Sequence, residues 1–315
     1  PAGRPESQVR WRRGPAAMEL QTLSGHTGWV EAVAFGTIDG DPVLATGGGD
    51  ATVRLWDPRT GRPRGQPLTG HTGSVEAVAF GVIDGDPVLA SAGWDRTVRL
   101  WDPRTGRPRG QPLTGHTDRV EAVAFGTIDG DPALATGSRD ATVRLWDART
   151  GLPRGQPLTG HTDRVEAVAF GSVDGNPVLA AASYYRMVWL WDARTGQPRG
   201  QPLTGHTGQV AAVAFGAIDG HPVLATGSTD ATVRLWDTRT GELITVIPAL
   251  VEVHAVAVVP GGVAIAAGSS VLVVDVPGLH PQPPPPHPPP PRIRGGRCWP
   301  RWLRRFTLRA SGLPS

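Results

Sequence analysis

The sequence predicts an all-β fold, a β-propeller built of four-stranded blades, on the basis of three observations. A Gly-His pair recurs every 45 residues, first at Gly25-His26 and next at Gly70-His71. Each Gly-His pair is followed by a Trp-Asp pair whose Trp lies 30 residues after the His; the first is Trp56-Asp57. Strand-like runs separated by Gly- and Pro-rich turns fill all five copies. A period of about 40–45 residues containing four short strands is typical of one propeller blade.

The first repeat justifies each element in turn. Residues 30–35 are largely apolar and β-forming, as expected of a strand that is buried on both sides. Turns follow at 39–42 and 47–50, where Gly, Asp and Pro concentrate. A link rich in Gly and Pro leads to an outer strand, where a proline is tolerated because one edge is unpaired. The remaining elements are strands at 43–46 and 52–56, the link at 58–65 and the outer strand near 66–68.

This pattern resembles the WD40-repeat family over residues 18–276, and most closely the bacterial type with near-identical tandem 45-residue repeats. The resemblance implies a hydrogen-bonded chain in each blade, running from a Trp indole through a Ser or Thr hydroxyl and a His ring to an Asp carboxylate. Such networks would specify blade geometry, because an unpaired buried polar group costs about 1–3 kcal/mol. The matching positions are His26, Thr46, Asp50, Trp56; His71, Ser91, Asp95, Trp101; His116, Thr136, Asp140, Trp146; and His206, Thr226, Asp230, Trp236.

The fourth repeat departs from this pattern. Ala181 stands where the hydroxyl is expected, and Tyr185 where the acid is expected. His161 and Trp191 would therefore lose their hydrogen-bond partners. We predict that the fourth blade is the weakest or the most locally distorted.

Six blades are the predicted number. After the fifth repeat, strand-like runs at 253–258, 263–267 and 271–274 form a degenerate unit that lacks a fourth strand. Residues 18–23 form an unassigned strand at the other end of the chain, and pairing the two pieces would close the propeller and remove an open edge. Seven blades in a longer parent protein are the alternative. Trp11 precedes His26 by the repeat offset, although Arg12 replaces the expected Asp, and the chain begins at Pro1 rather than Met.

Charge and composition divide the chain into four predicted parts. Of its 31 basic residues, all Arg, seven lie in 277–315 and four in 1–17, so the repeats hold 20 Arg against 27 acidic residues. The basic character therefore lies in the end segments, and nucleic-acid binding by the propeller is not expected. The parts are a basic tail or blade remnant (1–17), the propeller (18–276), a Pro-rich linker (277–291) and a basic tail predicted to be disordered (292–315).

The sequence also predicts a cytoplasmic protein. A single cysteine, Cys298, excludes an internal disulfide framework. No signal peptide is visible. The longest apolar run, 243–259, is interrupted by Pro248, Glu252 and His254, so no transmembrane segment is expected.

No residue pattern points to catalysis, a cofactor or a metal. His71, Ser91 and Asp95 could suggest a hydrolase triad, but equivalent sets recur around the repeats, which favours a structural role. The Asp-Gly-Asp turns offer far fewer oxygens than the about 6–8 that Ca²⁺ requires, so turn formation explains them better. Phosphate-binding loops and zinc spacings are also missing from the sequence.

Differences between the near-identical repeats concentrate in two loops, which a propeller places on its narrow face. Large aromatic and arginine side chains occupy these loops, and Trp, Tyr and Arg are enriched at interface hot spots. Four arginines on neighbouring blades would suit an acidic or phosphorylated partner, although drift of exposed loops would produce similar variation. The candidate partner-binding residues are Trp29, Trp94, Arg119, Arg139, Arg164, Tyr184, Tyr185 and Arg186.

The predicted function is therefore a non-enzymatic interaction scaffold that binds a peptide or protein on the narrow face. The resemblance implies that it could be the sensing or docking part of a larger bacterial signalling protein. Two alternatives remain: a catalytic propeller with a site in its central channel, and a passive repeat fragment whose basic tail binds anionic surfaces. The sequence identifies neither the partner nor the oligomeric state.

Overall fold

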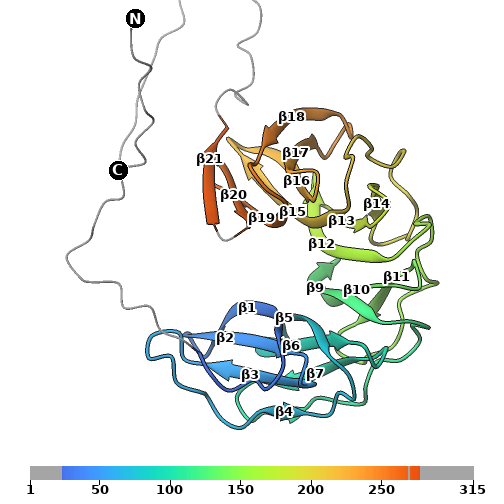
Figure 1. Ribbon diagram of the computed structural model, residues 1–315. Helices are drawn as coiled ribbons and strands as arrows, with labels where there is room; N and C mark the ends of the chain where they lie inside the picture. Colours follow the sequence, from blue (N-terminus) through green and yellow to red (C-terminus); the bar gives the residue numbers. More distant parts are fainter. Residues whose placement is uncertain (1–22, 269, 277–315) are drawn as a thin grey trace, which may run out of the picture. The chain divides into compact units, whose positions relative to one another are not determined.

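The computed structural model describes residues 23–268 and 270–276, which form 21 β-strands and no helix (Figure 1). The strands group into six antiparallel sheets, here called blades 1–6 in chain order. The all-β prediction and the number of six blades are both confirmed.

Each blade runs in sequence order from its first strand to its last. Blade 1 comprises β1 (Val30–Ile38), β2 (Asp41–Gly48), β3 (Thr52–Trp56) and β4 (Leu68–Thr69); blade 2 comprises β5 (Val75–Ile83), β6 (Asp86–Gly93), β7 (Val98–Asp102) and β8 (Arg107–Pro108). Blade 3 comprises β9 (Val120–Ile128), β10 (Asp131–Ser138) and β11 (Val143–Asp147), and blade 4 comprises β12 (Val165–Val173), β13 (Asn176–Ser183) and β14 (Val188–Asp192). Blade 5 comprises β15 (Val210–Ile218), β16 (His221–Ser228), β17 (Thr232–Asp237) and β18 (Leu243–Pro248), and blade 6 comprises β19 (Val253–Val259), β20 (Gly262–Ala267) and β21 (Ser270–Asp275).

In blades 1 to 4 the outer strand is shorter than the sequence suggested, whereas β18 of blade 5 has six residues. In blade 1 it is the two-residue β4, and in blades 3 and 4 it shrinks to single bridges, Val143 with Leu158 and Val188 with Leu203. The preceding link, rich in Gly and Pro, leaves few residues able to donate to a ladder, so the outer pairing stays marginal.

Tight Asp-Gly turns join the first and second strands of the five repeats. In blade 1, Asp39 and Gly40 both have positive φ, 53° and 86°. A two-residue hairpin turn with positive φ at both central positions favours Asp-Gly, because glycine adopts this conformation without steric cost. Backbone geometry therefore explains these turns.

The first strands of neighbouring blades pack side by side (Figure 1), and one contact recurs at each of these junctions. A Cβ atom at Gly36 of β1 would overlap the ring of Phe80 on β5, so the ring occupies the space that the glycine leaves. The equivalent pairs are Gly81 with Phe125, Gly126 with Phe170, Gly171 with Phe215, and Gly216 with Val258.

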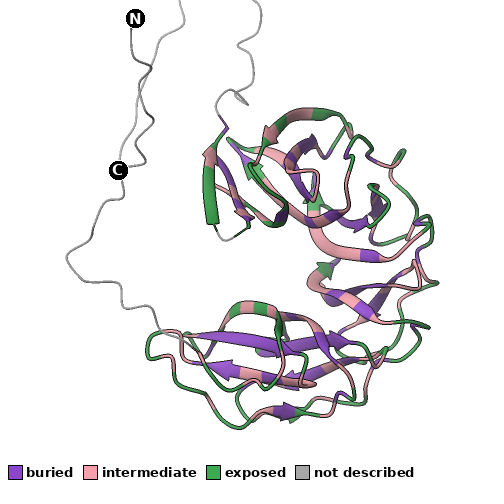
Figure 2. Ribbon diagram, viewed as in Figure 1, coloured by how far each residue is buried: buried purple, intermediate pink, exposed green. Residues whose placement is uncertain are grey.

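The hydrophobic core lies between blades. Trp101 of blade 2 packs in one cluster with Ile38, Val43 and Leu55 of blade 1. Buried residues follow the second and third strands of the blades, as Figure 2 shows. Each blade thus covers its neighbour's apolar face, which is the expected behaviour of a repeat protein.

The first and last blades carry unmatched apolar faces among the described residues. Phe35 of β1 is 72% exposed, whereas its counterparts on β5, β9, β12 and β15 are half-buried. Val271 and Val273 of β21 are exposed as well. The predicted closing strand at 18–23, Trp11, and the segments 1–17, 277–291 and 292–315 lie outside the described residues, so their roles stay predictions.

Candidate functional site

Two loops lie together at one end of each of the five repeat blades. The loop before the first strand carries the Gly-His pair, and the turn between the second and third strands carries the aspartate in all but blade 4. A backbone hydrogen bond joins them: the Trp94 N–H donates to the Ser74 carbonyl at 2.9 Å, and the Arg139 N–H donates to the Arg119 carbonyl at 2.9 Å. We call this end of the blades the His–Asp face.

In blade 2, the predicted network forms one continuous hydrogen-bonded chain. The Trp101 indole N–H donates to Ser91 Oγ at 2.8 Å, and Ser91 Oγ lies 2.8 Å from His71 Nε2. The other ring nitrogen, Nδ1, lies 2.9 Å from Asp95 Oδ2. Because an indole can only donate, the hydroxyl proton points to Nε2, and Nδ1–H donates to the carboxylate. Blades 1, 3 and 5 contain the same chain.

The carboxylates at the end of these chains are held in the ionised form. Burial alone would raise the pKa of Asp230, but hydrogen bonds from the Thr232 hydroxyl, the Thr207 N–H and His206 outweigh it and lower the pKa to about 2. The same opposition of burial and hydrogen bonding lowers the pKa of Asp50 to about 2. Each aspartate thus accepts several donors, which fixes the two loops relative to each other.

Blade 4 keeps the strand register but lacks the chain. Ala181 and Tyr185 replace the hydroxyl and the acid, and both ring nitrogens of His161 are buried without a hydrogen-bond partner. His161 is only 7% exposed, and burial lowers its pKa to about 4. Because β12 and β13 pair with the same register shift as β5 and β6, the change is a loss of hydrogen bonds rather than a distortion of the strands.

Arg119 and Arg164, two of the predicted partner-binding arginines, stack on aromatic residues of the same face. Arg119 of blade 3 lies over the Trp94 ring of blade 2, 3.5 Å from its centroid, and Arg164 lies over Tyr184 at 4.2 Å. Tyr184 in turn packs edge-on against Tyr185, with ring centroids 6.1 Å apart. The structure therefore forms two stacks on this face, one that joins blades 2 and 3 and one within blade 4.

The side chains of the other three predicted residues take no part in these stacks. Arg139 forms an ion pair with Glu121. Arg186 lies in the turn of blade 4 with a positive φ of 66° and forms no ion pair in the described structure. Trp29 of blade 1 is 85% exposed and has no aromatic or cationic neighbour among the described residues.

Sequence reasoning missed a row of glutamates beside these arginines. Glu31, Glu76, Glu121 and Glu166 are the second residues of the first strands in blades 1 to 4. Burial, with the negative charges of Glu121 and Glu31, raises the pKa of Glu76. Burial also raises the pKa of Glu166, although it forms an ion pair with Arg164. The sequence signal for this row was a glutamate that recurs in an otherwise apolar strand. Because Glu121 and Glu166 form ion pairs with Arg139 and Arg164, the positive charge of these arginines is partly neutralised.

The opposite end of the blades carries a ladder of ion pairs. Arg104 of blade 2 binds Asp39 of blade 1 at 2.6 Å and Asp86 of its own blade at 2.9 Å. Arg149 bonds in the same way to Asp84 and Asp131. The turn aspartates therefore bind arginines of the next blade.

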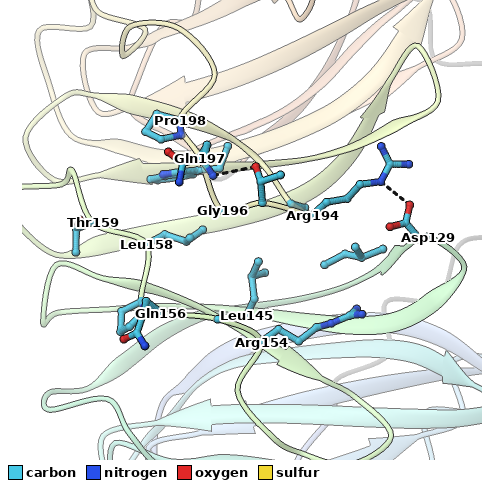
Figure 3. A pocket seen from close by; sticks show the side chains of 16 residues that line it. Asp129, Leu145, Arg154, Gln156, Leu158, Thr159, Arg194, Gly196, Gln197 and Pro198 are labelled. Carbon is cyan, nitrogen blue, oxygen red and sulfur yellow. Dashed lines mark hydrogen bonds and ion pairs between the residues drawn. The ribbon is translucent and has the colours of Figure 1, made fainter.

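A cavity of about 700 Å³ lies between the outer parts of blades 3 and 4 (Figure 3). Gln156 and Leu158 of the blade 3 link line one side, and Arg194, paired with Asp129, lines the other. Equivalent residues line cavities between blades 4 and 5 and between blades 1 and 2. Because equivalent residues line all three cavities, the repeat itself, where a link passes the next blade, accounts for them better than a dedicated binding site.

Two further properties concern only the part of the chain that the structure describes. No group of three or more His, Cys, Asp or Glu side chains there could hold a metal ion. Nor does that part contain a helix with the length and apolar character needed to cross a bilayer.

Comparison with known proteins gives matches to one family. The model described as "WD domain, G-beta repeat" matches residues 18–57, 62–102, 107–147, 153–192 and 196–237, together more than half of the chain. A WD repeat-containing protein of Synechocystis sp., described as uncharacterized, is 39% identical over 56 residues. That match covers 18% of this chain and 16% of the relative.

Proposed function

Because the chain belongs to the WD40-repeat family, whose members are generally interaction scaffolds rather than enzymes, we propose that it binds a peptide or protein on the His–Asp face. This face carries the two variable loops that we predicted from the sequence to lie on the narrow face of the propeller. One observation carries the proposal: side chains that differ between otherwise near-identical repeats gather on this face. Trp29, Trp94 and Tyr185 are exposed there, and Trp and Tyr are among the residue types most enriched at interface hot spots.

We further propose that the partner is acidic or phosphorylated. Arg186 is free to pair with an anion, and Arg119 offers a guanidinium already held over Trp94. Such a preorganised cation loses little side-chain entropy on binding. The glutamate row limits the positive field, so the expected partner presents one or two acidic groups rather than a long acidic tract.

The wider context also belongs to the proposal. The near-identical repeats and the relative from Synechocystis support a bacterial protein, and the single cysteine supports a cytoplasmic one. Residues 18–276 would then form the docking part of a signalling protein. Binding would then localise or sense a partner while another domain acts on it.

The test is binding of the full chain to an array of acidic, phosphorylated and neutral peptides, followed by fluorescence anisotropy. The variant Arg119→Gln/Arg186→Gln removes two charges from the His–Asp face without placing new acids beside Glu121 and Glu166. Its matched control, Arg59→Gln/Arg62→Gln, removes two charges from the opposite end.

We expect at least tenfold weaker binding of acidic peptides by the first variant and unchanged binding by the control. Equal losses in both variants would show non-specific electrostatics and contradict the proposal. Binding that disappears when residues 277–315 are deleted, with a steep dependence on salt, would favour the basic tail as the binding element.

A further inference from the structure

Two contacts recur together at the junctions between neighbouring repeat blades. Between blades 1 and 2, the Phe80 ring fills the space beside Gly36, and Arg104 forms an ion pair with Asp39 at 2.6 Å. The preceding blade thus supplies the glycine and the aspartate, three residues apart, and the following blade supplies the phenylalanine and the arginine. The next three junctions repeat both contacts: Gly81 with Phe125 and Asp84 with Arg149, Gly126 with Phe170 and Asp129 with Arg194, and Gly171 with Phe215 and Asp174 with Arg239.

Blade 1 carries the phenylalanine and the arginine of such a junction, but neither has its partner among the described residues. Phe35 is 72% exposed and Val33 is 62% exposed. Val30 is 54% exposed, whereas the equivalent valines of blades 2 to 5 are fully buried: Val75, Val120, Val165 and Val210. Arg59 stands at the position of Arg104 in blade 2, and its guanidinium forms no ion pair within the part of the chain that the structure describes. We call Val30, Val33, Phe35 and Arg59 the leading face of blade 1.

Blade 6 does not complement the leading face. Val258 takes the place of the phenylalanine in blade 6, so Val259 stands where the repeat blades carry the glycine. A valine there would occupy the space that the Phe35 ring requires, because even a Cβ atom on the glycine of a repeat blade would overlap the ring of the next blade. The turn that follows is Pro260-Gly261, which offers no aspartate to Arg59. Blade 6 therefore lacks both residues that a repeat-type junction with blade 1 needs.

The matching residues elsewhere in this sequence are already engaged. The motif Phe-Gly-x-x-Asp-Gly occurs five times, and each copy lies in the hairpin between the first and second strands of its own blade. The glycine of each copy is in contact with the next blade. A second copy of the chain offers the same five hairpins in the same occupied state. The predicted closing strand at 18–23 contains no glycine.

We propose that the leading face of blade 1 binds a β-hairpin of a partner protein, with a glycine of the hairpin against the Phe35 ring and an aspartate of its turn paired with Arg59. The interface would continue the repeat-to-repeat junction by one more hairpin. Burial of Val30, Val33 and Phe35 would drive the association, and the ion pair would fix the orientation of the hairpin. The leading face uses none of the residues proposed to bind an acidic peptide, so it is a second interaction surface.

The four repeat junctions identify the chemistry of the partner. At each of them the phenylalanine and the arginine meet a glycine and an aspartate. A hairpin with a bulky residue in place of the glycine could not approach the Phe35 ring, and one with a basic residue in its turn would repel Arg59. Specificity would therefore depend on two positions of the partner hairpin.

The test measures binding of the full chain to a fluorescein-labelled, backbone-cyclised hairpin with the sequence of residues 75–93, which carries Gly81 and Asp84. We expect saturable binding in fluorescence anisotropy. A hairpin with Gly81→Val should bind about tenfold more weakly or worse, because valine suits the strand but occupies the space of the Phe35 ring. A hairpin with Asp84→Asn keeps the turn, since asparagine tolerates positive φ, and should lose affinity severalfold at low salt and little at high salt.

Variants of the chain locate the binding surface. Phe35→Ala should weaken binding of the native hairpin as strongly as Gly81→Val in the hairpin does. Arg59→Gln should weaken it severalfold and should abolish the difference between the native and the Asp84→Asn hairpins, because the ion pair is then already absent. Val271→Ala is the matched control, at a similarly exposed apolar site on β21, and should leave binding unchanged.

Several results would overturn the proposal. Absence of saturable binding, equal binding of the native and Gly81→Val hairpins, or full binding by the Phe35→Ala chain would each refute the leading face as a docking surface. Equal losses in the Phe35→Ala and Val271→Ala chains would show non-specific apolar adhesion and refute it as well.

The outcome is separable from the function proposed for the His–Asp face. The variant Arg119→Gln/Arg186→Gln should bind acidic peptides more weakly and the hairpin normally. Loss of hairpin binding in this variant would place the hairpin on the His–Asp face and refute the second surface. Binding of acidic peptides without binding of the hairpin would refute the leading-face proposal alone.

Discussion

Replacing Ser91 by alanine removes the single oxygen that connects Trp101 to His71 in blade 2. Ser91 Oγ lies 2.8 Å from Trp101 Nε1 and 2.8 Å from His71 Nε2, and Ser91 is fully buried. Two hydrogen bonds of about 1 kcal/mol each are lost, and two buried polar groups are left unpaired, so we expect a loss of about 2–4 kcal/mol in the free energy of unfolding. Blade 4, where Ala181 occupies this position, shows that the strands themselves tolerate the change.

Guanidinium chloride unfolding of the full chain measures this loss, and amide hydrogen exchange localises it to blade 2. Ser91→Thr is the conservative control, because three other repeats carry threonine there and it keeps the hydroxyl. Ser24→Ala, at an exposed position, should change stability by less than about 0.5 kcal/mol. If Ser91→Ala were as mild as Ser24→Ala, the network could not be a main determinant of blade stability.

The remaining predictions concern pH, packing, charge and closure. Stability from Asp50, whose pKa is lowered to about 2, should be complete above the unfolded pKa of about 4 and vanish as pH falls through 2, in acid unfolding followed by circular dichroism. His161, whose pKa is lowered to about 4, should make blade 4 lose stability as pH falls from about 6.5 to 4, and faster amide exchange there would reveal it. Gly81→Val should cost at least about 2 kcal/mol in chemical denaturation, because its side chain would overlap Phe125; a smaller cost would mean that the blades separate easily. Arg149→Ala should change the midpoint of chemical denaturation only slightly, and less still in high salt, because its ion pairs are exposed and screened by solvent. Deletion of residues 1–22 should speed exchange in β21 if the predicted closing strand is correct, and unchanged exchange would contradict it.

Much of the fold could be predicted from the repeat, because a residue pattern that recurs every 45 residues predicts the same strand or turn in each blade. The positions of His71, Ser91 and Asp95 were recognisable since the same residue types return in three other copies. The loss of the network in blade 4 followed from Ala181 and Tyr185 in the same way. Repetition thus made the framework predictable.

Contacts between different blades were not predictable in this way. The stacking of Arg119 on Trp94 joins loops of two blades and occurs at only one junction, so no periodic signal marks it. Within blade 3, the ion pair of Arg139 with Glu121 was also not predictable, because it depends on side-chain geometry and Arg139 does not recur in the other repeats. The four arginines expected from the sequence to be available to a partner therefore include two, Arg139 and Arg164, that already form ion pairs.

The contact of Phe80 with Gly36 has a consequence for how this protein changes over generations. Because the four repeat-to-repeat junctions share the same aromatic-on-glycine fit, a whole repeat duplicated or lost by recombination would still meet a complementary surface on both sides. Only the junction to blade 6, where Val258 takes the place of the phenylalanine, is particular to its position. Repeats can be exchanged as units, and a loop residue that improves binding in one blade can spread to another without any redesign of the core.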